Sequence, residues 1–556
     1  MTHSQRTSGA RLRTRAAEVG LDAIGRLLRL PPTRSRYTVN RVQIPMRDGV
    51  VLLADHYLPS TAAPAGTIVV RCPYGRSAPF SLVFASLYAA RGYHVVLQSV
   101  RGTFGSGGVF EPMANEAADG TDTVAWLREQ PWFTGRFATI GLSYLGFTQW
   151  ALLNDPPPEL AAAVITVGPH DFWDSTWRTG AFSINDFLGW SDMVSRQENR
   201  RKALIRQLTG PRAVARALRQ VPVGPAARRL LGTGAPWFES WVQHPEPEDP
   251  FWQPRSFPAA LDRVQVPVLL LSGWQDLFLR QTLAQYRHLH ERGLDVALTI
   301  GPWTHTQMIT KGLGVVTRES MDWLDTHLGH APARQRASAV KVFITGQGWK
   351  EMPSWPPATR EKPLYLQPSG ALGWDQPDAE VQPATYRSDP ADPTPVVGGP
   401  LLSPQGGYRD DTSLAERTDV LTFTSNPLAH DLSVFGNPVA EIRHSADNPH
   451  VDVLVRISEV DPAGRSQNVS DGYLRLSDAT DAATVRIDLE AIAHRFTAGS
   501  RIRVLVAGSW FPRYSLNLGA GEPTLSASRI VPAQHSVHFG PSRVLLPVQA
   551  DAANFV

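Results

Sequence analysis

Residues 137–154 read F-A-T-I-G-L-S-Y-L-G-F-T-Q-W-A-L-L-N. The first five predict a buried strand, and the stretch from Phe147 predicts a helix. Ser143 therefore stands at a sharp turn between them, where its hydroxyl would lie above a sheet at the positive end of a helix dipole. Gly141 and Gly146 would let the two backbones pass closely. The pattern indicates a nucleophile elbow, although the second glycine comes one place later than in G-x-S-x-G and an ordinary strand–helix turn is the alternative.

A serine nucleophile needs a base and an acid that orients the base, in the chain order Ser, Asp or Glu, His for this kind of sheet. Two later strands end in such residues: the run 266–272 leads to Asp276, and the run 296–301 leads to His305. Each alone has a plain alternative, a helix cap for Asp276 and a loop histidine for His305. Three such residues in this order at three strand ends predict the catalytic triad Ser143, Asp276 and His305.

The pattern around these motifs predicts an α/β fold. From Tyr37 onward, short apolar runs alternate with helical stretches, which is typical of a mainly parallel sheet covered on both faces. Several runs have no polar side, as expected for strands buried on both faces. The candidate strands are residues 67–71, 94–99, 137–141, 163–168, 266–272 and 296–301.

Two changes of texture divide the chain further. Residues 171–261 are rich in Arg, Leu, Ala and Trp at helical spacing, which predicts a helical cap inserted into the α/β domain of residues 37–170 and 262–330. Residues 331–556 carry short alternating runs, such as 340–345, 451–458 and 501–507, separated by turn residues. Such spacing predicts a β-sandwich or jelly roll.

The basic residues of the chain are concentrated in two stretches. The chain has 54 Lys and Arg against 51 Asp and Glu, a net charge of +3, and a pI of about 9.0. Residues 1–40 hold eight arginines against two acids, and a second basic block lies at 196–229. Neither block interleaves aromatic residues with its bases, so we expect no nucleic-acid partner. Solvated helix faces account for both blocks.

The N-terminal residues 1–36 are a basic extension. Within it, residues 20–30 alternate apolar and charged positions and predict an amphipathic helix that packs on its own domain or frays, with contact to a membrane surface as the weaker alternative. No window is apolar enough for an integral membrane segment. Cys72 is the one cysteine, which excludes an intrachain disulfide and a cysteine-based metal site and favours a cytoplasmic location.

Six stretches resemble the bacterial cocaine esterase and X-prolyl dipeptidyl peptidase group of α/β-hydrolases, also called CocE/NonD-type hydrolases. They are M-R-D-G at 46–49, R-C-P-Y at 71–74, R-G-T-F-G-S-G at 101–107, G-L-S-Y-L-G at 141–146, G-W-Q-D at 273–276 and G-P-W-T-H at 301–305. The resemblance extends over about residues 37–548, since 461–464 and 510–513 are similar to the family's C-terminal jelly roll. It implies an α/β-hydrolase fold with a helical cap and a C-terminal β-domain.

The resemblance also implies site residues. Tyr74 matches the family's tyrosine hydroxyl that serves as an oxyanion donor, and the backbone N–H of Tyr144 would be the other donor. Trp177, Trp190 and Phe278 match aromatic residues that line an acyl pocket, while core packing of the inserted helices remains the alternative for the two tryptophans. Such a pocket would favour apolar or aromatic acyl groups.

The expected activity is ester hydrolysis by a two-step acyl transfer. This mechanism requires neither a metal nor an organic cofactor, and the glycines at 102–108 lack G-x-G-x-x-G spacing, so no dinucleotide site is predicted. Leu277, Phe278 and Arg280 follow Asp276 where relatives that recognise a free amino group carry carboxylates. An X-prolyl dipeptidyl peptidase or amide acylase is the alternative enzyme, and an inactive carbohydrate-binding or scaffold protein is the alternative from another class. The oligomeric state, a homo-oligomer included, stays open.

Overall fold

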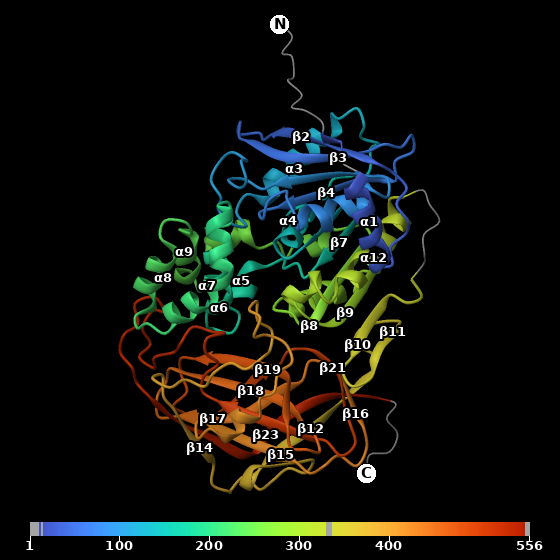
Figure 1. The fold of residues 1–556 in the computed structure, drawn as a ribbon. Coiled ribbons are helices and arrows are strands. Elements are labelled where there is room, and N and C mark those ends of the chain that lie inside the picture. The colour runs from blue at the N-terminus through green and yellow to red at the C-terminus, as the bar shows by residue number, and fades with distance from the viewer. Residues whose placement is uncertain (1–10, 13–14, 330–335, 551–556) are drawn as a thin grey trace.

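The computed structural model describes residues 11–12, 15–329 and 336–550. A large sheet flanked by helices forms one part, a second set of strands forms another, and a group of helices lies at one side against both (Figure 1). Backbone hydrogen bonds join that helical group to the second set of strands, for example from Arg475 N–H to Thr179 and from Ser515 N–H to Phe182. Within the described ranges, no helix combines the length and apolar character that crossing a membrane requires.

The first sheet has eleven strands among the described residues, in the order β1-β2-β3-β5-β4-β6-β7-β8-β9-β10-β11. The strands from β5 to β10 in this order run parallel, whereas β1 to β3 and β11 are antiparallel to their neighbours. Their bounds are β1 Arg11–Leu12, β2 Tyr37–Pro45, β3 Val51–Pro59, β4 Gly66–Cys72, β5 Tyr93–Ser99, β6 Phe137–Leu142, β7 Leu160–Thr166, β8 Val268–Gln275, β9 Val296–Thr304, β10 Val340–Ile344 and β11 Gly348–Met352.

The central strands are buried on both faces, as their sequence predicts. Every residue of β4, β5, β6, β7 and β8 is buried, because helices cover both sides of a parallel sheet. α3 packs on α4, α4 on α10 and α10 on α11, while α12 packs against β7. The helix bounds are α1 Arg15–Leu27, α2 Leu87–Ala89, α3 Glu116–Arg128, α4 Tyr144–Leu153, α10 Ala260–Arg263, α11 Leu279–Glu291 and α12 Leu313–His327. The predicted α/β fold is confirmed.

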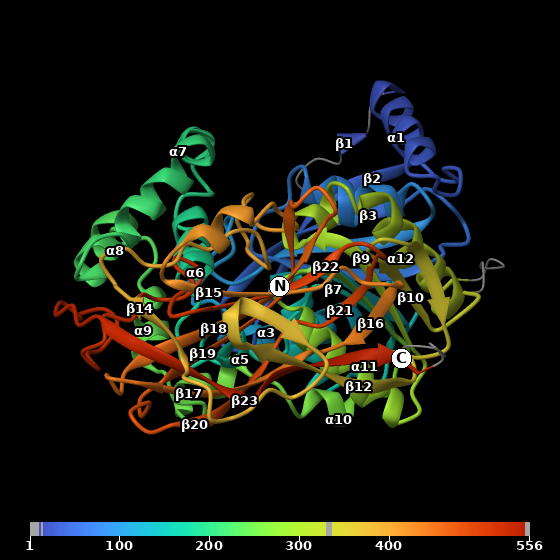
Figure 2. The same cartoon turned by 90° about the horizontal axis from the view of Figure 1, so that it is seen from below.

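The helical group stands in the chain between β7 and β8, where the sequence predicts an insertion, and we call residues 171–261 the cap. It lies on the opposite side of the molecule from α1 (Figure 2). Its core is rich in aromatic side chains, among them Phe172, Phe187 and Trp241, whose rings contact one another. Its elements before α10 are α5 Phe172–Thr176, α6 Ile184–Val194, α7 Arg200–Leu218, α8 Val223–Leu231, α9 Trp237–Gln243 and a 3-10 helix, Pro250–Arg255.

The second set of strands encloses its own apolar core, which includes Leu364, Val455, Val504 and Leu546 among its fully buried members. β23 is its longest strand and pairs with β12, β14, β16 and β17. The bounds are β12 Thr359–Gln367, β13 Ala371–Gly373, β14 Ala384–Ser388, β15 Val420–Ser425, β16 Leu432–Gly436, β17 Val439–Ala446, β18 Val451–Val460, β19 Ser466–Leu476, β20 Ala483–Asp488, β21 Ile492–Phe496, β22 Arg501–Ala507 and β23 Ala533–Gln549.

One predicted strand is assigned to the wrong sheet. The sequence places residues 340–345 in the C-terminal β-domain, but 340–344 form β10, which pairs in parallel with β9 and extends the first sheet. Val340, Val342 and Ile344 are fully buried while the residues between them are half-buried. β10 shows this alternation because it lies near the sheet edge, and the same alternation is typical of sandwich strands.

The N-terminal segment packs on the first domain. α1 begins at Arg15, five residues before the predicted helix, and Leu21 and Leu28 are buried in the main core. Arg318 donates a hydrogen bond to the Leu28 carbonyl, and Arg91 donates one to the Pro31 carbonyl. The prediction that this helix packs on its own domain holds for the described part of the segment. Residues 1–10 lie outside the described residues.

Candidate active site

Ser143 occupies a strained turn between β6 and α4. Its φ of 58° and ψ of −121° lie outside the regions that L-residues prefer. The turn is possible because glycines stand two residues before and three residues after Ser143: a Cβ on Gly146 would lie 2.6 Å from the Gly168 Cα, and one on Gly141 would lie 2.4 Å from the Leu145 Cβ. The side chain of Ser143 is half-buried. The local geometry is that of a nucleophile elbow.

Asp276 and His305 meet at the carboxyl ends of neighbouring strands. Asp276 follows β8, and His305 begins the short 3-10 helix His305–Ile309 after β9. The Asp276 Oδ1 lies 2.6 Å from the His305 Nδ1, and its Oδ2 accepts a hydrogen bond from the Phe278 N–H at 2.9 Å. Both side chains are buried. Since Nδ1 is engaged, Nε2 is the ring nitrogen left to act as a base.

The structure thus brings two of the predicted triad members together and places Ser143 at the end of a strand of the same sheet. Among the described residues, no direct hydrogen bond joins the Ser143 hydroxyl to His305. In ligand-free enzymes, catalytic hydrogen bonds are often long and tighten only when substrate binds.

Tyr74 follows β4, and its hydroxyl interacts with Ser143. Burial raises the pKa of this hydroxyl well above its ordinary value, although hydrogen bonds with Trp190 and Ser143 lower it. The hydroxyl therefore stays protonated and able to donate. The Trp190 Nε1–H donates a hydrogen bond to the Tyr74 Oη at 3.0 Å. The Tyr74 hydroxyl thus lies beside the predicted nucleophile.

The side chain of Tyr144 is anchored away from the reaction side of the elbow. Its hydroxyl donates to the Glu116 Oε1 at 2.7 Å and accepts from the Met113 N–H at 2.9 Å. Glu116 forms a buried ion pair with Arg71, with 2.7 Å between Oε2 and Nη2. Burial raises the pKa of the Tyr144 hydroxyl strongly. This anchoring fixes the residue whose backbone N–H is the second predicted oxyanion donor.

The three predicted pocket aromatics take different places. Phe278 lies edge-on to the His305 ring at 5.3 Å between centroids. Trp190 is stacked on Tyr144 at 6.2 Å and 8°. Trp177 donates from its indole to the Trp241 carbonyl and packs inside the cap. Phe278 and Trp190 therefore contact the candidate catalytic groups directly, whereas the contacts of Trp177 are those of a core residue.

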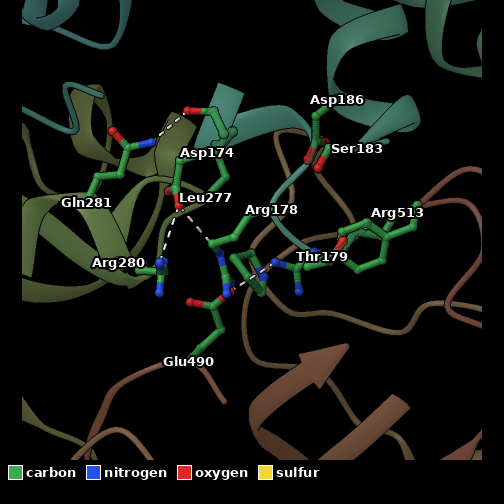
Figure 3. Close-up of a pocket in the computed structure, with 13 residues that line it drawn as sticks. Asp174, Arg178, Thr179, Ser183, Asp186, Leu277, Arg280, Gln281, Glu490 and Arg513 are labelled. Carbon is green, nitrogen blue, oxygen red and sulfur yellow. Dashed lines mark hydrogen bonds and ion pairs between the residues drawn. The ribbon is translucent and has the colours of Figure 1, made fainter. Parts of the chain in front are cut away.

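A polar pocket that the sequence does not predict lies beside Leu277, at the junction of the cap, the first domain and the second set of strands. Figure 3 shows Asp174 between Arg178 and Arg280, and Glu490 reaching toward Arg513. The Asp174 Oδ1 lies 3.3 Å from the Arg280 Nη2, and the Glu490 Oε1 lies 3.1 Å from the Arg513 Nη2. These two carboxylates come from distant segments, so no local signal reveals them, and each is already paired with an arginine.

Asp186, on α6, is a third carboxylate of this pocket. Its Oδ1 accepts a hydrogen bond from the Leu402 N–H at 3.0 Å. Burial raises the pKa of the Asp186 carboxyl, while Leu402, Arg513 and the nearby His305 lower it. Asp186 therefore ties the cap to the loop that carries Leu402.

Comparisons with known proteins identify the family of the chain. Residues 48–307 match the model of the X-Pro dipeptidyl-peptidase (S15 family), and residues 333–544 match that of the X-Pro dipeptidyl-peptidase C-terminal non-catalytic domain. The chain is 31% identical to the cocaine esterase of Rhodococcus sp. (strain MB1 Bresler), over 92% of this chain and 98% of that protein.

Similar solved structures support the same relationship. An aminopeptidase from the marine sediment archaeon Thaumarchaeota archaeon is 26% identical, with a TM-score of 0.79 over 92% of this chain and 96% of that one. An α-amino acid ester hydrolase is 25% identical, with a TM-score of 0.79 over 92% and 97%. The identity and coverage together settle the relationship: the chain belongs to the S15 family, the group of α/β-hydrolases that includes cocaine esterase and the X-Pro dipeptidyl-peptidases.

Proposed function

We propose that the protein is a serine carboxylesterase that forms an acyl-enzyme on Ser143. The observation that carries the proposal is the buried 2.6 Å contact between Asp276 and His305, at the same sheet edge as the strained Ser143. A buried imidazole that is oriented by a carboxylate serves as the general base for a serine nucleophile. The similarity to a cocaine esterase supports an ester as the substrate.

In the first half of the proposed reaction, the His305 Nε2 takes the proton of the Ser143 hydroxyl as Oγ attacks the ester carbonyl. The C–O bond to the alcohol then breaks, and the same imidazole gives its proton to the leaving oxygen. In the second half, the His305 Nε2 takes a proton from water as the water oxygen attacks the acyl carbon. The bond between this carbon and the Ser143 Oγ then breaks, Oγ regains a proton from the imidazole, and the acid is released. Asp276 holds the imidazole tautomer and stabilises the imidazolium throughout.

The negative charge of the tetrahedral intermediate falls on the former carbonyl oxygen. The Tyr74 hydroxyl and the Tyr144 N–H would hold this oxygen, because a preorganised pair of donors stabilises charge that develops only in the transition state. The raised pKa of Tyr74 keeps its proton in place at neutral pH.

The aromatic surroundings support apolar or aromatic acyl groups. Phe278 contacts His305, and Trp190 contacts Tyr144, so a bound acyl group would lie among ring faces and edges. Trp177 would line such a pocket only from deeper in the cap.

The second candidate is an X-prolyl dipeptidyl peptidase or amide acylase with the same triad, which the similarity to an aminopeptidase supports. Recognition of a free α-amino group needs an available carboxylate. Asp174 and Glu490 lie near Leu277, but each is engaged by an arginine. The ester is therefore the favoured substrate.

Two assays test these candidates. Ser143→Ala should abolish turnover of p-nitrophenyl esters with circular dichroism unchanged, and wild-type turnover in this variant would overturn the proposal. The wild-type enzyme should cleave p-nitrophenyl esters faster than an Xaa-Pro p-nitroanilide. The reverse order would favour the peptidase.

The proposed partner is a small-molecule ester, without a nucleic acid, and the proposed mechanism is the same for a monomer and for a homo-oligomer. We place the protein in the cytoplasm because its one cysteine, Cys72, is buried and unpaired. Cell fractionation tests this location.

A further inference from the structure

The cap reaches the predicted oxyanion tyrosine and the residue before it with one hydrogen bond each. The Trp190 Nε1–H donates to the Tyr74 Oη at 3.0 Å. The Gln197 side-chain amide donates to the carbonyl of Pro73, the preceding residue, at 2.8 Å. Both donors come from α6 and the turn that follows it, whereas Tyr74 follows β4 of the first sheet. One short stretch of the cap therefore holds both the hydroxyl of this tyrosine and the backbone of the residue before it.

The direction of the first hydrogen bond is fixed by chemistry. An indole N–H can only donate, and a phenol oxygen can accept one hydrogen bond while its own proton donates elsewhere. The Tyr74 proton is therefore not used on Trp190 and stays available to an oxyanion. Accepting a hydrogen bond also polarises the hydroxyl and makes it a stronger donor.

Trp190 itself is held firmly. Its side chain is buried, and its ring contacts those of Phe110, Trp237 and Trp241. It is also stacked nearly parallel on Tyr144. Trp190 thus contacts the side chains of both residues that would supply the oxyanion donors.

A third contact links the cap to the same region. The exposed Glu198 carboxylate accepts a hydrogen bond from the Phe104 N–H at 2.7 Å. The Phe104 ring lies against Gly75, where a Cβ would come within 2.8 Å of it. Gly75 follows Tyr74 directly, so the cap restrains the chain on both sides of the tyrosine.

We propose that Trp190 is a positioning residue for the oxyanion hole, with Gln197 as a second tie, so that the cap sets the Tyr74 hydroxyl in place as well as covering the site. This inference rests on the proposed function. It goes beyond the role of a pocket wall, because that role needs the indole ring and makes no use of its N–H.

A double-mutant cycle tests the inference on p-nitrophenyl butyrate. Trp190→Phe keeps an aromatic ring and removes the N–H, and we expect kcat to fall about tenfold, with KM changed less than about twofold. Tyr74→Phe should lower kcat by about 10²- to 10³-fold. In the Tyr74→Phe background, Trp190→Phe should cost less than about twofold more, since its partner hydroxyl is gone.

Trp252→Phe is the matched control. Trp252 is also buried in the cap and donates from its indole to a backbone carbonyl, that of His244, at 3.0 Å, but its ring packs against Phe172 and Phe251. The kcat of Trp252→Phe should stay within about twofold of the wild-type value. If Trp190→Phe does not fold, Gln197→Ala in both backgrounds gives the same test, with an expected loss of about threefold in the wild-type background alone.

An independent readout is the affinity for phenylboronic acid, whose tetrahedral adduct on Ser143 presents an oxyanion-like oxygen. Trp190→Phe should weaken this affinity about tenfold, in step with kcat. The inference fails if the double variant loses kcat by the product of the Trp190→Phe and Tyr74→Phe losses, or if Trp190→Phe and Trp252→Phe lose kcat equally. Either result would leave the proposed function intact. If Ser143→Ala keeps turnover, it is the proposed function that fails.

Discussion

The carboxylate of Asp276 lies 2.6 Å from the Nδ1 of His305, and both side chains are almost fully shielded from water. The two residues come from adjacent strand ends, so the backbone of the sheet fixes their contact. In this setting the carboxylate selects the imidazole tautomer that leaves Nε2 free to accept a proton.

Asp276→Asn should therefore leave the fold intact and lower kcat by about 10⁴-fold, because an amide favours the wrong tautomer. Steady-state kinetics on a p-nitrophenyl ester and circular dichroism measure the two effects. Asp174→Asn, at a carboxylate of the neighbouring polar pocket, serves as the control for the loss of one negative charge. A small loss in Asp276→Asn, similar to that in the control, would remove Asp276 from the triad.

Gly146→Ala should destabilise the protein by about 1–3 kcal/mol and reduce activity, because its methyl would be forced against backbone. The Cβ would lie 2.6 Å from the Gly168 Cα. Gly20→Ala is the control: Gly20 is exposed in α1 with nothing within 4 Å of its Cβ, and the change should stabilise by up to about 1 kcal/mol. Urea unfolding measures the free energy of unfolding of both variants. Equal changes in the two would contradict the close approach of Gly146 to Gly168.

The buried ion pair beneath Tyr144 should be sensitive to loss of one partner. Glu116→Ala leaves the Arg71 guanidinium buried without its carboxylate, and the expected cost is about 3–5 kcal/mol of unfolding free energy. Glu159→Ala breaks the ion pair with Arg128, a residue that is 45% exposed, and should cost less than about 1 kcal/mol. Denaturant titration compares the two, and a cost for Glu116→Ala no larger than that for Glu159→Ala is the contrary result.

Stability should fall in mild acid because of a histidine pair in the second set of strands. The His444 Nε2 and the His535 Nδ1 lie 2.9 Å apart, and burial lowers the pKa of His444 to about 4 and that of His535 to about 3. The unfolded chain, with an ordinary histidine pKa of about 6.5, then binds more protons than the folded chain as the pH falls below that value.

The neutral state of this pair contributes to the free energy of unfolding fully above about pH 6.5. This contribution, on the order of 3 kcal/mol for His444 alone, is lost progressively toward about pH 4. Urea unfolding at several pH values measures it. The free energy of unfolding of His444→Gln should change less with pH than that of the wild type across this range. Superimposable slopes for the two proteins would mean that His444 has the same pKa in the folded and the unfolded chain.

Much of the fold could be predicted from the sequence, since strands buried on both faces leave short, unbroken apolar runs between helices. The predicted strand 94–99 becomes Tyr93–Ser99 and 137–141 becomes Phe137–Leu142. The prediction fails at the sheet edge, where the half-buried alternation of β10 resembles a sandwich strand. It also places the end of the fourth strand two residues late, because Val167 leaves the strand with a φ of 44°.

The candidate site divides in the same way. Ser143, Asp276 and His305 could be predicted because each follows a recognisable strand, and the sheet itself brings such ends together. The contact of Trp190 with Tyr74 joins residues 116 positions apart, and that of Asp186 with Leu402 spans 216. No local pattern encodes such pairs, because they depend on how the cap and the second set of strands pack.

The central claim is that Ser143 is the activated nucleophile. Reaction of the wild-type protein with a fluorophosphonate probe, followed by peptide mass spectrometry, tests it most directly and also separates an enzyme from an inactive binding or scaffold protein. We predict a single label on Ser143, none in Ser143→Ala, and much slower labelling in Asp276→Asn. A wild-type protein that hydrolyses esters without labelling, or that carries the label on another residue, would contradict the account.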